Sequence, residues 1–301
     1  MISGAVLEAF QKFVPKENIH LGESLAAHTT FRVGGAADCL LELETEEQLI
    51  AVRRYLEKVG IPFFLLGNGS NTLVRDEGYR GVVLQIAGKM NRIRVEGNHI
   101  IAQAGALMSQ VARAALEHGL TGLEFASGIP GTVGGGVVMN AGAYGGEMCQ
   151  VVTHVRVVNQ ESEVMVLDNE AMEFGYRHSA IRHQPFVVTE VAFALEPGDP
   201  AEIKAVMDDL AARRREKQPL EYPSAGSTFK RPKGYYAGEL IMNAGLRGFQ
   251  IGGARVSDKH CGFVINTGNA TAADILELIG EIQRRVKERF GVELEPEVIV
   301  R

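Results

Sequence analysis

The residues from Gly128 to Gly146 constrain this chain more than any other stretch. They read GIPGTVGGGVVMNAGAYGG, with eight glycines among nineteen residues. Glycine costs conformational entropy and offers no side chain to bury, so this composition predicts a loop, not a packed helix or strand. Such a backbone turns through positive φ, lets another surface approach closely and presents N–H groups to an anion. We predict a loop that wraps a phosphate-bearing cofactor; tight turns without a ligand are the alternative.

The overall composition predicts a globular chain with ample core. It has 301 residues, 46% of them hydrophobic, and a formal charge of −6, which argues against a non-specific nucleic-acid binder. No apolar run reaches about 18 residues and the N-terminus lacks the features of a signal peptide, so we expect no membrane partner. Cys39, Cys149 and Cys261 are few and far apart, which suggests reduced thiols in the cytoplasm. No metal-ligand spacing occurs, so we expect no metal site, and we expect a monomer.

Helices and strands alternate along the chain without internal repeats. We expect helices at residues 3–13, about 45–59, 107–118, 201–217, 237–244 and 271–290. We expect strands at 38–43 and 63–66, within 82–104 and 151–167, and at 186–195 and 298–300. Thr45 with Gln48, and Thr271 with Asp274, have the spacing of helix-capping pairs. The class is therefore α+β or α/β in at least two lobes, with a boundary near residues 196–200.

A second segment with phosphate-binding character is GNGSNTLV, residues 67–74, directly after a strand. Its backbone N–H groups and short polar side chains suit a pyrophosphate. The spacing matches neither GxGxxG nor GxxxxGK[ST], so neither a standard Rossmann site nor a P-loop is supported. A simple β-turn explains this segment equally well. Together with residues 128–146, however, it makes a more specific signal than either segment alone.

Three other places carry groups that suit an anionic substrate. Arg177, in FGYRHSAIR, offers a planar fork for a carboxylate or phosphate, although an exposed arginine on a strand edge is the simpler interpretation. Ser227, in PSAGSTFKRP, lies near cations; it could act as a nucleophile, an acid or a turn hydroxyl, and no GxSxG elbow surrounds it. Glu295 and Glu297 lie near the last predicted strand, where carboxylates are usually solvated. Pro296 fixes the local chain and could turn Glu297 inward.

Six motifs occur in order: TTFRVGG (29–35), LGNGSNTLV (66–74), SGIPGTVGGGVVMNAGAYGGEM (127–148), YRHS (176–179), SAGSTFKRP (224–232) and LEPEV (294–298). Together they resemble the UDP-N-acetylenolpyruvoylglucosamine reductase family from about residue 28 to the end. The resemblance implies an α+β fold with a two-subdomain FAD-binding lobe of the vanillyl-alcohol-oxidase (PCMH) type and an α+β substrate-binding domain. The implied parts are residues 1–80 and 81–198 (FAD subdomains), 199–295 (substrate domain) and 296–301 (a strand returning to the active site).

The resemblance also implies a reaction. NADPH reduces non-covalently bound FAD, and the reduced flavin passes hydride to UDP-N-acetylglucosamine enolpyruvate, giving UDP-N-acetylmuramate for peptidoglycan synthesis in the cytoplasm. The residues implied to hold FAD are Arg32, Gly34, Gly35, Gly67, Asn68, Gly69, Ser70, Asn71, Ser127, Gly128, Ile129, Pro130, Gly131, Thr132, Gly134, Gly135, Asn140, Ala141 and Gly142.

The same motif match implies roles for three catalytic residues. Ser227 is the proton donor, and Arg177 and Glu297 flank the substrate carboxylate, where Arg177 stabilises the developing enolate. A second anion beside a carboxylate is unfavourable, so we hypothesise that Glu297 is protonated and donates a hydrogen bond. Lys217, Lys230, Arg231 and His260 are weaker candidates for contacts to the diphosphate or substrate, and His260 is equally compatible with a structural role.

One departure separates this chain from the longer members of the family. Those members carry an inserted loop whose tyrosine covers the substrate, whereas the residues between Arg177 and Lys217 here are few and include no tyrosine. The chain therefore resembles the shorter class. Two other functions stay open: another FAD oxidoreductase of the same superfamily, acting on an alcohol or sugar lactone, or a flavin-binding protein without turnover.

Overall fold

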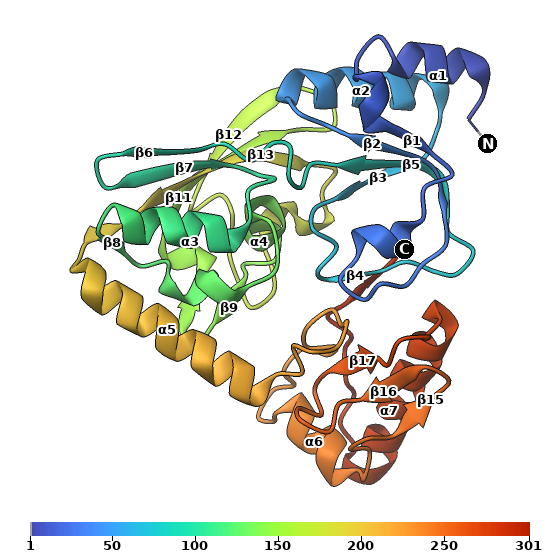
Figure 1. Cartoon of the computed structure of the whole chain (residues 1–301), viewed down its shortest axis with the longest axis vertical. Helices are drawn as coiled ribbons and strands as arrows, with labels where there is room; N and C mark the ends of the chain where they lie inside the picture. The colour runs from blue at the N-terminus through green and yellow to red at the C-terminus, as the bar shows by residue number, and fades with distance from the viewer. Residues whose placement is uncertain (1) are drawn as a thin grey trace. The chain divides into compact units, whose positions relative to one another are not determined.

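A computed structural model describes residues 2–301 (Figure 1). Its contacts group the chain into two compact units. Unit 1 contains the chain up to Leu21, Asp38–Asn68 and Gly81–Arg213; unit 2 contains Gly22–Ala37, Gly69–Arg80 and Arg214–Arg301. The four-part division expected from the sequence is finer than this grouping and stays a prediction.

The first sheet of unit 1 has four strands in the order β1-β2-β5-β3. These are β1 (Ile19–Leu21), β2 (Ala37–Glu42), β5 (Tyr79–Gln85) and β3 (Phe63–Leu66), with β3 and β5 parallel. Helices α1 (Gly4–Phe10) and α2 (Glu46–Val59) share a hydrophobic core with β2 and β5. Thr45 caps α2 as predicted, because its hydroxyl accepts the N–H of Gln48 over 3.2 Å. The helix ends at Gly60, whose φ of 68° is left-handed.

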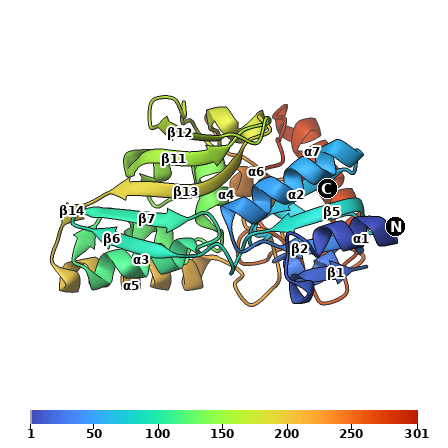
Figure 2. The ribbon, with the colours of Figure 1, turned by 90° about the horizontal axis from the view of Figure 1, so that it is seen from above.

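The second sheet of unit 1 has five strands in the order β12-β11-β13-β7-β6, and Figure 2 shows them in this order. The strands are β12 (Val164–Asp168), β11 (Val152–Val158), β13 (Val187–Ala194), β7 (His99–Gln103) and β6 (Ile93–Glu96), and each is antiparallel to its neighbours. Helices α3 (Met108–Glu117) and α4 (Val133–Val138) pack against β7. Burial alternates along β7, whereas β13 is almost wholly buried and the edge strand β12 is mostly exposed.

Short elements complete unit 1. Strand β8 (Leu120–Thr121) pairs with β14 (Glu196–Pro197), and β9 (Gly142–Ala143) pairs with β10 (Gly146–Glu147). Helix α5 (Pro200–Lys217) follows, and its residues up to Arg213 belong to this unit. Single 3₁₀ turns in the chain lie at Lys16–Asn18, Leu25–His28, Glu124–Gly128, Met148–Gln150 and Ala180–His183.

Unit 2 combines a small antiparallel sheet with two helices. The sheet contains β15 (Gln250–Ile251), β16 (Ala254–Val256) and β17 (Val264–Asn266), and the helices are α6 (Ala237–Asn243) and α7 (Ala272–Phe290). Strand β18 (Ile299–Val300) pairs in parallel with β4 (Thr72–Leu73). Thr271 caps α7 as predicted, and the Asp76 carboxylate accepts the N–H groups of Ala272 and Ala273, each over 2.8 Å.

The stretch from Gly128 to Gly146 differs from the predicted loop. It contains the buried helix α4, with the sequence VGGGVV, and the β9–β10 hairpin. A Cβ added to Gly134 would stand 2.9 Å from the Cβ of Ala104, so glycine is needed here for close packing. Among the described glycines of this stretch, positive φ occurs only at Gly145. The prediction of a close approach was right, whereas the predicted absence of a packed helix was wrong.

Two properties of residues 2–301 bear on the function classes. No helix there combines the length and hydropathy that crossing a membrane requires. In the same residues, His, Cys, Asp and Glu side chains form no group of three or more able to hold a metal ion.

Candidate active site

The two glycine-rich segments meet in unit 1. The side-chain Nδ2 of Asn68 donates a hydrogen bond to the carbonyl of Pro130 over 2.6 Å. A Cβ on Gly67 would lie 2.6 Å from the hydroxyl oxygen of Thr132, so this close approach requires glycine. Strand β3, which ends at Leu66, delivers Gly67 to this place. The structure thus brings Gly67 and Asn68 to Pro130–Thr132.

Unpaired backbone donors surround this junction. Four N–H groups donate no hydrogen bond within residues 2–301: those of Gly67, Asn68, Gly131 and Thr132. Thr132 is only 2% exposed, and a buried N–H without a partner is rare in a folded protein. In contrast, Val133 and Gly134 donate to the carbonyls of Ala106 and Ala104 over 2.8 and 2.9 Å. An anion at this junction would therefore meet residues 67–68 and 131–132, and not the first turn of α4.

Asn140 fixes the shape of the glycine-rich stretch. It is 1% exposed with φ 42°, and its Nδ2 donates to Glu147 Oε2 and to the carbonyl of Gly175, both over 3.0 Å. Its Oδ1 accepts the N–H of Cys149 over 2.9 Å. Both N–H donors of the amide are therefore used inside unit 1, so the side chain supports the backbone and has no donor left for a ligand.

Arg177 is attached to the same stretch. Its φ of 53° is left-handed, and its Nη2 donates to the carbonyl of Gly142 over 3.3 Å. Nearby, the Ser179 hydroxyl donates to the carbonyl of Val138 over 2.8 Å. The half-buried Arg177 guanidinium also lies 5.0 Å from the centre of the Tyr176 ring. These contacts set the guanidinium beside the segment that carries the predicted cofactor residues.

Ser227 and Glu297 belong to neighbouring segments of unit 2. The N–H of Glu297 donates to the carbonyl of Thr228 over 2.8 Å. Ser227 is exposed, and its hydroxyl makes no hydrogen bond within residues 2–301. Thr228, by contrast, is buried, and its hydroxyl accepts the N–H of Val264 over 3.0 Å. Of these two adjacent hydroxyls, Ser227 is therefore the one available to a ligand.

Asn71 holds the segment that contains Glu297. Its Nδ2 donates to the carbonyl of Glu297 over 3.1 Å, and its own carbonyl accepts the N–H of Ile299 over 2.9 Å. The N–H groups of Ser70 and Asn71 donate no hydrogen bond within residues 2–301. A residue predicted to bind the cofactor thus lies beside one predicted to be catalytic.

The remaining predicted cofactor residues of unit 2 form a tightly packed pair of segments. A Cβ on Gly35 would lie 2.2 Å from the carbonyl oxygen of Asp76, and one on Gly69 would lie 2.2 Å from that of His28. Gly34, with φ 127°, packs on Val74. Arg32 is exposed at the turn between them, with φ 54°. These glycines are explained by backbone contact within the unit.

The four weaker substrate candidates also lie in unit 2. Lys230 pairs with Glu295, and the Arg231 guanidinium carbon lies 4.3 Å from the centre of the Tyr236 ring. Lys217 is exposed at the end of α5. Burial lowers the pKa of His260, whose Nδ1 accepts the N–H of Gly262 over 3.1 Å. A neutral histidine that is already bonded fits a structural role better than a diphosphate contact.

The predicted catalytic residues are divided between the units. Arg177 belongs to unit 1, whereas Ser227 and Glu297 belong to unit 2. The structure therefore assembles Arg177 with the glycine-rich stretch and Ser227 with Glu297. That the three residues act on one substrate stays a proposal.

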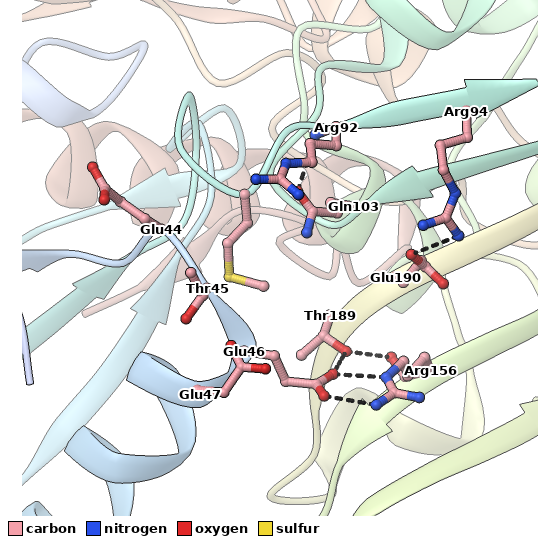
Figure 3. Close-up of a pocket in the computed structure, with 11 residues that line it drawn as sticks. Glu44, Thr45, Glu46, Glu47, Arg92, Arg94, Gln103, Arg156, Thr189 and Glu190 are labelled. Atoms are coloured by element: carbon pink, nitrogen blue, oxygen red, sulfur yellow. Dashed lines mark hydrogen bonds and ion pairs between the residues drawn. The ribbon is translucent and has the colours of Figure 1, made fainter.

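A separate polar pocket lies in unit 1, and none of its lining residues was predicted to bind or react (Figure 3). Arg156 forms a bidentate pair with Glu46 at 2.8 Å, and the Thr189 hydroxyl donates to Glu46 over 2.6 Å. Arg94 lies 3.5 Å from Glu190. The Arg156 guanidinium lowers the pKa of Glu46. These mutual pairs join α2 to the five-stranded sheet, which is a structural role.

Sequence reasoning did not single out two residues that organise unit 2. The Thr30 hydroxyl donates to the carbonyl of Ser224 over 2.7 Å, which connects residues 29–35 with the loop of Ser227. Asp76 caps a helix that begins almost 200 residues later. Thr30 lies inside a quoted motif, so its polarity was a usable signal. Asp76 had no local signal, because its partners are distant in sequence.

Comparisons with known proteins place these features in a family. A model for an FAD-binding domain matches residues 37–168, and one for the C-terminal domain of UDP-N-acetylenolpyruvoylglucosamine reductase matches residues 218–301. The reductase of that name from Geobacillus kaustophilus is 56% identical over 283 residues, covering 94% of this chain and 93% of the relative. The corresponding protein from Caldanaerobacter subterraneus is 52% identical over 293 residues, 97% of each chain. This chain belongs to the UDP-N-acetylenolpyruvoylglucosamine reductase family.

A solved structure supports the same assignment. The UDP-N-acetylenolpyruvylglucosamine reductase of Thermus caldophilus superposes with a TM-score of 0.80 at 39% identity, covering 94% of this chain and 97% of that one. The predicted family and the α+β fold class, with a PCMH-type FAD-binding lobe and a C-terminal domain, are therefore confirmed. Membership in this reductase family also makes the chain an FAD-dependent oxidoreductase.

Proposed function

We propose that this enzyme uses NADPH to reduce UDP-N-acetylglucosamine enolpyruvate to UDP-N-acetylmuramate, a step of peptidoglycan precursor synthesis in the cytoplasm. The observation that carries the proposal is family membership across nearly the whole chain, at 56% identity to one named reductase. If the chain were instead another FAD oxidoreductase of the same superfamily, Arg177, Ser227 and Glu297 would have no common role.

The residues of unit 1 fit the proposed cofactor. Unpaired N–H groups at residues 67–68 and 131–132 are suited to the pyrophosphate of FAD, because backbone donors without partners gain most from an anion. Ser127 and Ile129–Thr132 lie in the same stretch, and Ser70 and Asn71 in unit 2 stay predicted cofactor residues. When bound, FAD supplies the hydride transfer that no side chain can perform.

The chain's own residues would handle the substrate and its proton. The Arg177 guanidinium would bind the substrate carboxylate and stabilise the negative charge that develops beside it. The Ser227 hydroxyl would donate a proton to the carbon next to that carboxylate; serine is a weak acid, but the carbanion is a far stronger base and positioning lowers the barrier. A protonated Glu297 would donate a hydrogen bond to the carboxylate.

One experiment on the purified protein separates this function from its alternatives. The visible spectrum should show a flavin, NADPH should bleach it without oxygen, and UDP-N-acetylglucosamine enolpyruvate should restore it. Bleaching without restoration would reject the proposed substrate and favour another oxidoreductase of the superfamily. A bound flavin that NADPH does not bleach would favour a non-catalytic flavin protein.

A further inference from the structure

The turn from Gly175 to His178 in unit 1 holds Arg177 in a strained backbone conformation. The N–H of Gly175 donates to the carbonyl of His178, and the N–H of His178 donates to the carbonyl of Gly175, each over 3.1 Å. Arg177 lies inside this turn with φ 53°, a left-handed value that is uncommon for a residue other than glycine. Such a conformation persists only where surrounding contacts enforce it. The contacts that enforce it here therefore decide how the Arg177 side chain is aimed.

The peptide unit that joins Arg177 to His178 is held at both ends. Its N–H belongs to His178 and is bonded to Gly175. Its carbonyl belongs to Arg177 and accepts a hydrogen bond from Arg182 Nη1 over 2.5 Å. A hydrogen bond from a charged donor is shorter and roughly twice as strong as one between neutral groups. Arg182 thus holds the Arg177 carbonyl in place.

The backbone that carries Arg182 is itself anchored. Arg182 belongs to the 3₁₀ turn Ala180–His183, in which the N–H of Ala180 donates to the carbonyl of Met172 over 2.7 Å. Ile181, the residue before Arg182, is 2% exposed. Within residues 2–301, no carboxylate forms an ion pair with Arg182, so its replacement leaves no unpaired anion. The guanidinium therefore reaches the Arg177 carbonyl from a fixed base.

The placement of the Arg177 guanidinium depends on its backbone. Its Nη2 donates to the carbonyl of Gly142 over 3.3 Å, which is long for an N–H···O bond and too weak to enforce a strained φ. A guanidinium binds a carboxylate through a planar fork, so its orientation matters. A misplacement of about 1 Å can slow a reaction by on the order of 100-fold.

We propose that Arg182 is a positioning residue that holds the Arg177 backbone so that the Arg177 guanidinium meets the substrate carboxylate. This inference rests on the proposed function, since it takes Arg177 to bind that carboxylate. Arg182 lies outside the six motifs from which the catalytic set was predicted. It contacts neither the substrate nor the flavin in this account and acts through Arg177.

The test compares Arg182→Met, which removes the donor, with Arg182→Lys, which keeps a cationic one. Stopped-flow absorbance of the FAD-loaded protein separates flavin reduction by NADPH from flavin oxidation by UDP-N-acetylglucosamine enolpyruvate. Arg182→Met should slow the oxidation by about 10- to 100-fold and leave the reduction unchanged. Because Arg182 donates a single bond to this carbonyl, Arg182→Lys should stay within about threefold of wild type. Equal losses in the two variants, or a normal rate in Arg182→Met, would overturn the proposal.

A matched control exists in the same unit. Arg54 Nη2 donates to the carbonyl of Ser162 over 3.1 Å, and Ser162 also has a left-handed φ, of 60°. Arg54→Met removes an equivalent bond and should leave both half-reactions unchanged. A slowing equal to that of Arg182→Met would show a general effect on unit 1 and overturn the proposal. If melting temperatures show that Arg182→Met does not fold, the shorter and neutral Arg182→Gln replaces it.

A double-mutant cycle measures the coupling to Arg177. In an Arg177→Ala background, Arg182→Met should cause no further slowing of flavin oxidation, because the group that Arg182 positions is gone. An undiminished further slowing would contradict a role through Arg177.

A crystal structure of Arg182→Met tests the positioning role without the reaction. The Arg177 carbonyl should turn away from its wild-type direction, and an unchanged turn at residues 175–178 would overturn the proposal. If the enolpyruvate does not oxidise the flavin of the wild-type protein, the proposed function fails, and the crystal structure still decides whether Arg182 positions Arg177.

Discussion

The side-chain Nδ2 of Asn68 lies 2.6 Å from the carbonyl oxygen of Pro130 and joins two glycine-rich segments that are 62 residues apart. Each segment alone could be an ordinary turn. Their junction leaves four backbone N–H groups without partners, and a Cβ on Gly67 would lie 2.6 Å from the Thr132 hydroxyl oxygen. Such a junction has a use only if something else accepts those donors.

Asn68→Ala should therefore weaken FAD binding without unfolding the protein. Loss of one hydrogen bond that aligns the segments should raise the Kd of FAD by about tenfold. Titration of the apoprotein with FAD, followed by flavin fluorescence, measures this. Asn91→Ala is the matched control, since Asn91 Nδ2 donates to the carbonyl of Gly88 over 3.0 Å in a loop outside the site. Equal effects of the two changes would argue against a cofactor role for the junction.

Two glycine substitutions should have opposite effects on stability. Gly134→Ala sets a Cβ 2.9 Å from the Cβ of Ala104, and overpacking of this kind should cost about 1–3 kcal/mol. Gly280, exposed within α7, has nothing within 4 Å of an added Cβ, so Gly280→Ala should stabilise unit 2 by about 0.5–1 kcal/mol. Thermal unfolding measures both changes. A stabilising Gly134→Ala would mean that α4 is not closely packed.

Ser227→Ala should separate the two halves of the reaction. Flavin reduction by NADPH should proceed normally, whereas oxidation by the enolpyruvate should slow by about 10²–10⁴-fold, the usual contribution of a positioned proton donor. Stopped-flow absorbance resolves the two steps. Ser224→Ala makes the same chemical change in the same loop and should leave both steps unaltered. Slow flavin reduction in Ser227→Ala would contradict the proton-donor role.

Glu297→Gln tests whether this carboxyl acts in its protonated form. An amide also donates a hydrogen bond, so the variant should keep turnover within about tenfold of wild type, whereas Glu297→Ala should lose far more. Steady-state kcat with saturating NADPH provides the comparison. The hypothesis fails if glutamine impairs turnover as severely as alanine does, since that result would require the carboxylate itself.

The Glu46–Arg156 pair predicts the acid side of the stability profile. Because hydrogen bonding to Arg156 lowers the pKa of Glu46 below its ordinary value of 4.5, the pair stabilises the fold at neutral pH, and this contribution is lost as pH falls from that value through the lowered pKa. Glu46→Gln should lower the free energy of unfolding by about 1–3 kcal/mol at pH 7, and this difference from wild type should become smaller in acid. Urea unfolding from pH 7 to pH 3 measures this difference.

The control for that pair is Glu8→Gln on the exposed face of α1, where the structure shows no ion pair for Glu8 within residues 2–301. Its stability should follow the wild-type curve at every pH. If the difference in unfolding free energy between Glu46→Gln and wild type stays constant down to pH 3, the pKa of Glu46 does not differ between the folded and unfolded states.

Local signals predicted the long helices well. Helix α7 begins at the cap formed by Thr271 and Asp274 and ends at Gly291. These contacts join residues no more than four apart, so sequence patterns predict them directly. The VGGGVV helix was missed because its stability comes from packing on Ala104 and not from propensity. Strand β18 was predicted, at residues 298–300, whereas its partner β4 was not, because β4 has only two residues and pairs with a strand more than 200 residues away.

The candidate site was also predictable only in part. Motifs predicted Arg177, Ser227 and Glu297 and the two glycine-rich segments, because spacing between motifs is a property of the sequence. The hydrogen bonds and ion pairs of each side chain cannot be derived from the sequence. That both amide donors of Asn140 are used, and that Lys230 is paired with Glu295, follows from contacts that only the folded chain defines.

Unit 2 contains three passes of the chain, and its last strand pairs with β4 from the second pass. During synthesis, residues 22–37 and 69–80 leave the ribosome early, but the partners that complete their packing follow only with residues 214–301. Unit 2 therefore cannot finish folding until strand β18 has emerged, and a fragment beginning at residue 214 would lack both Asp76 and strand β4. The domain boundary visible in the family models is thus not a place where the chain can be cut.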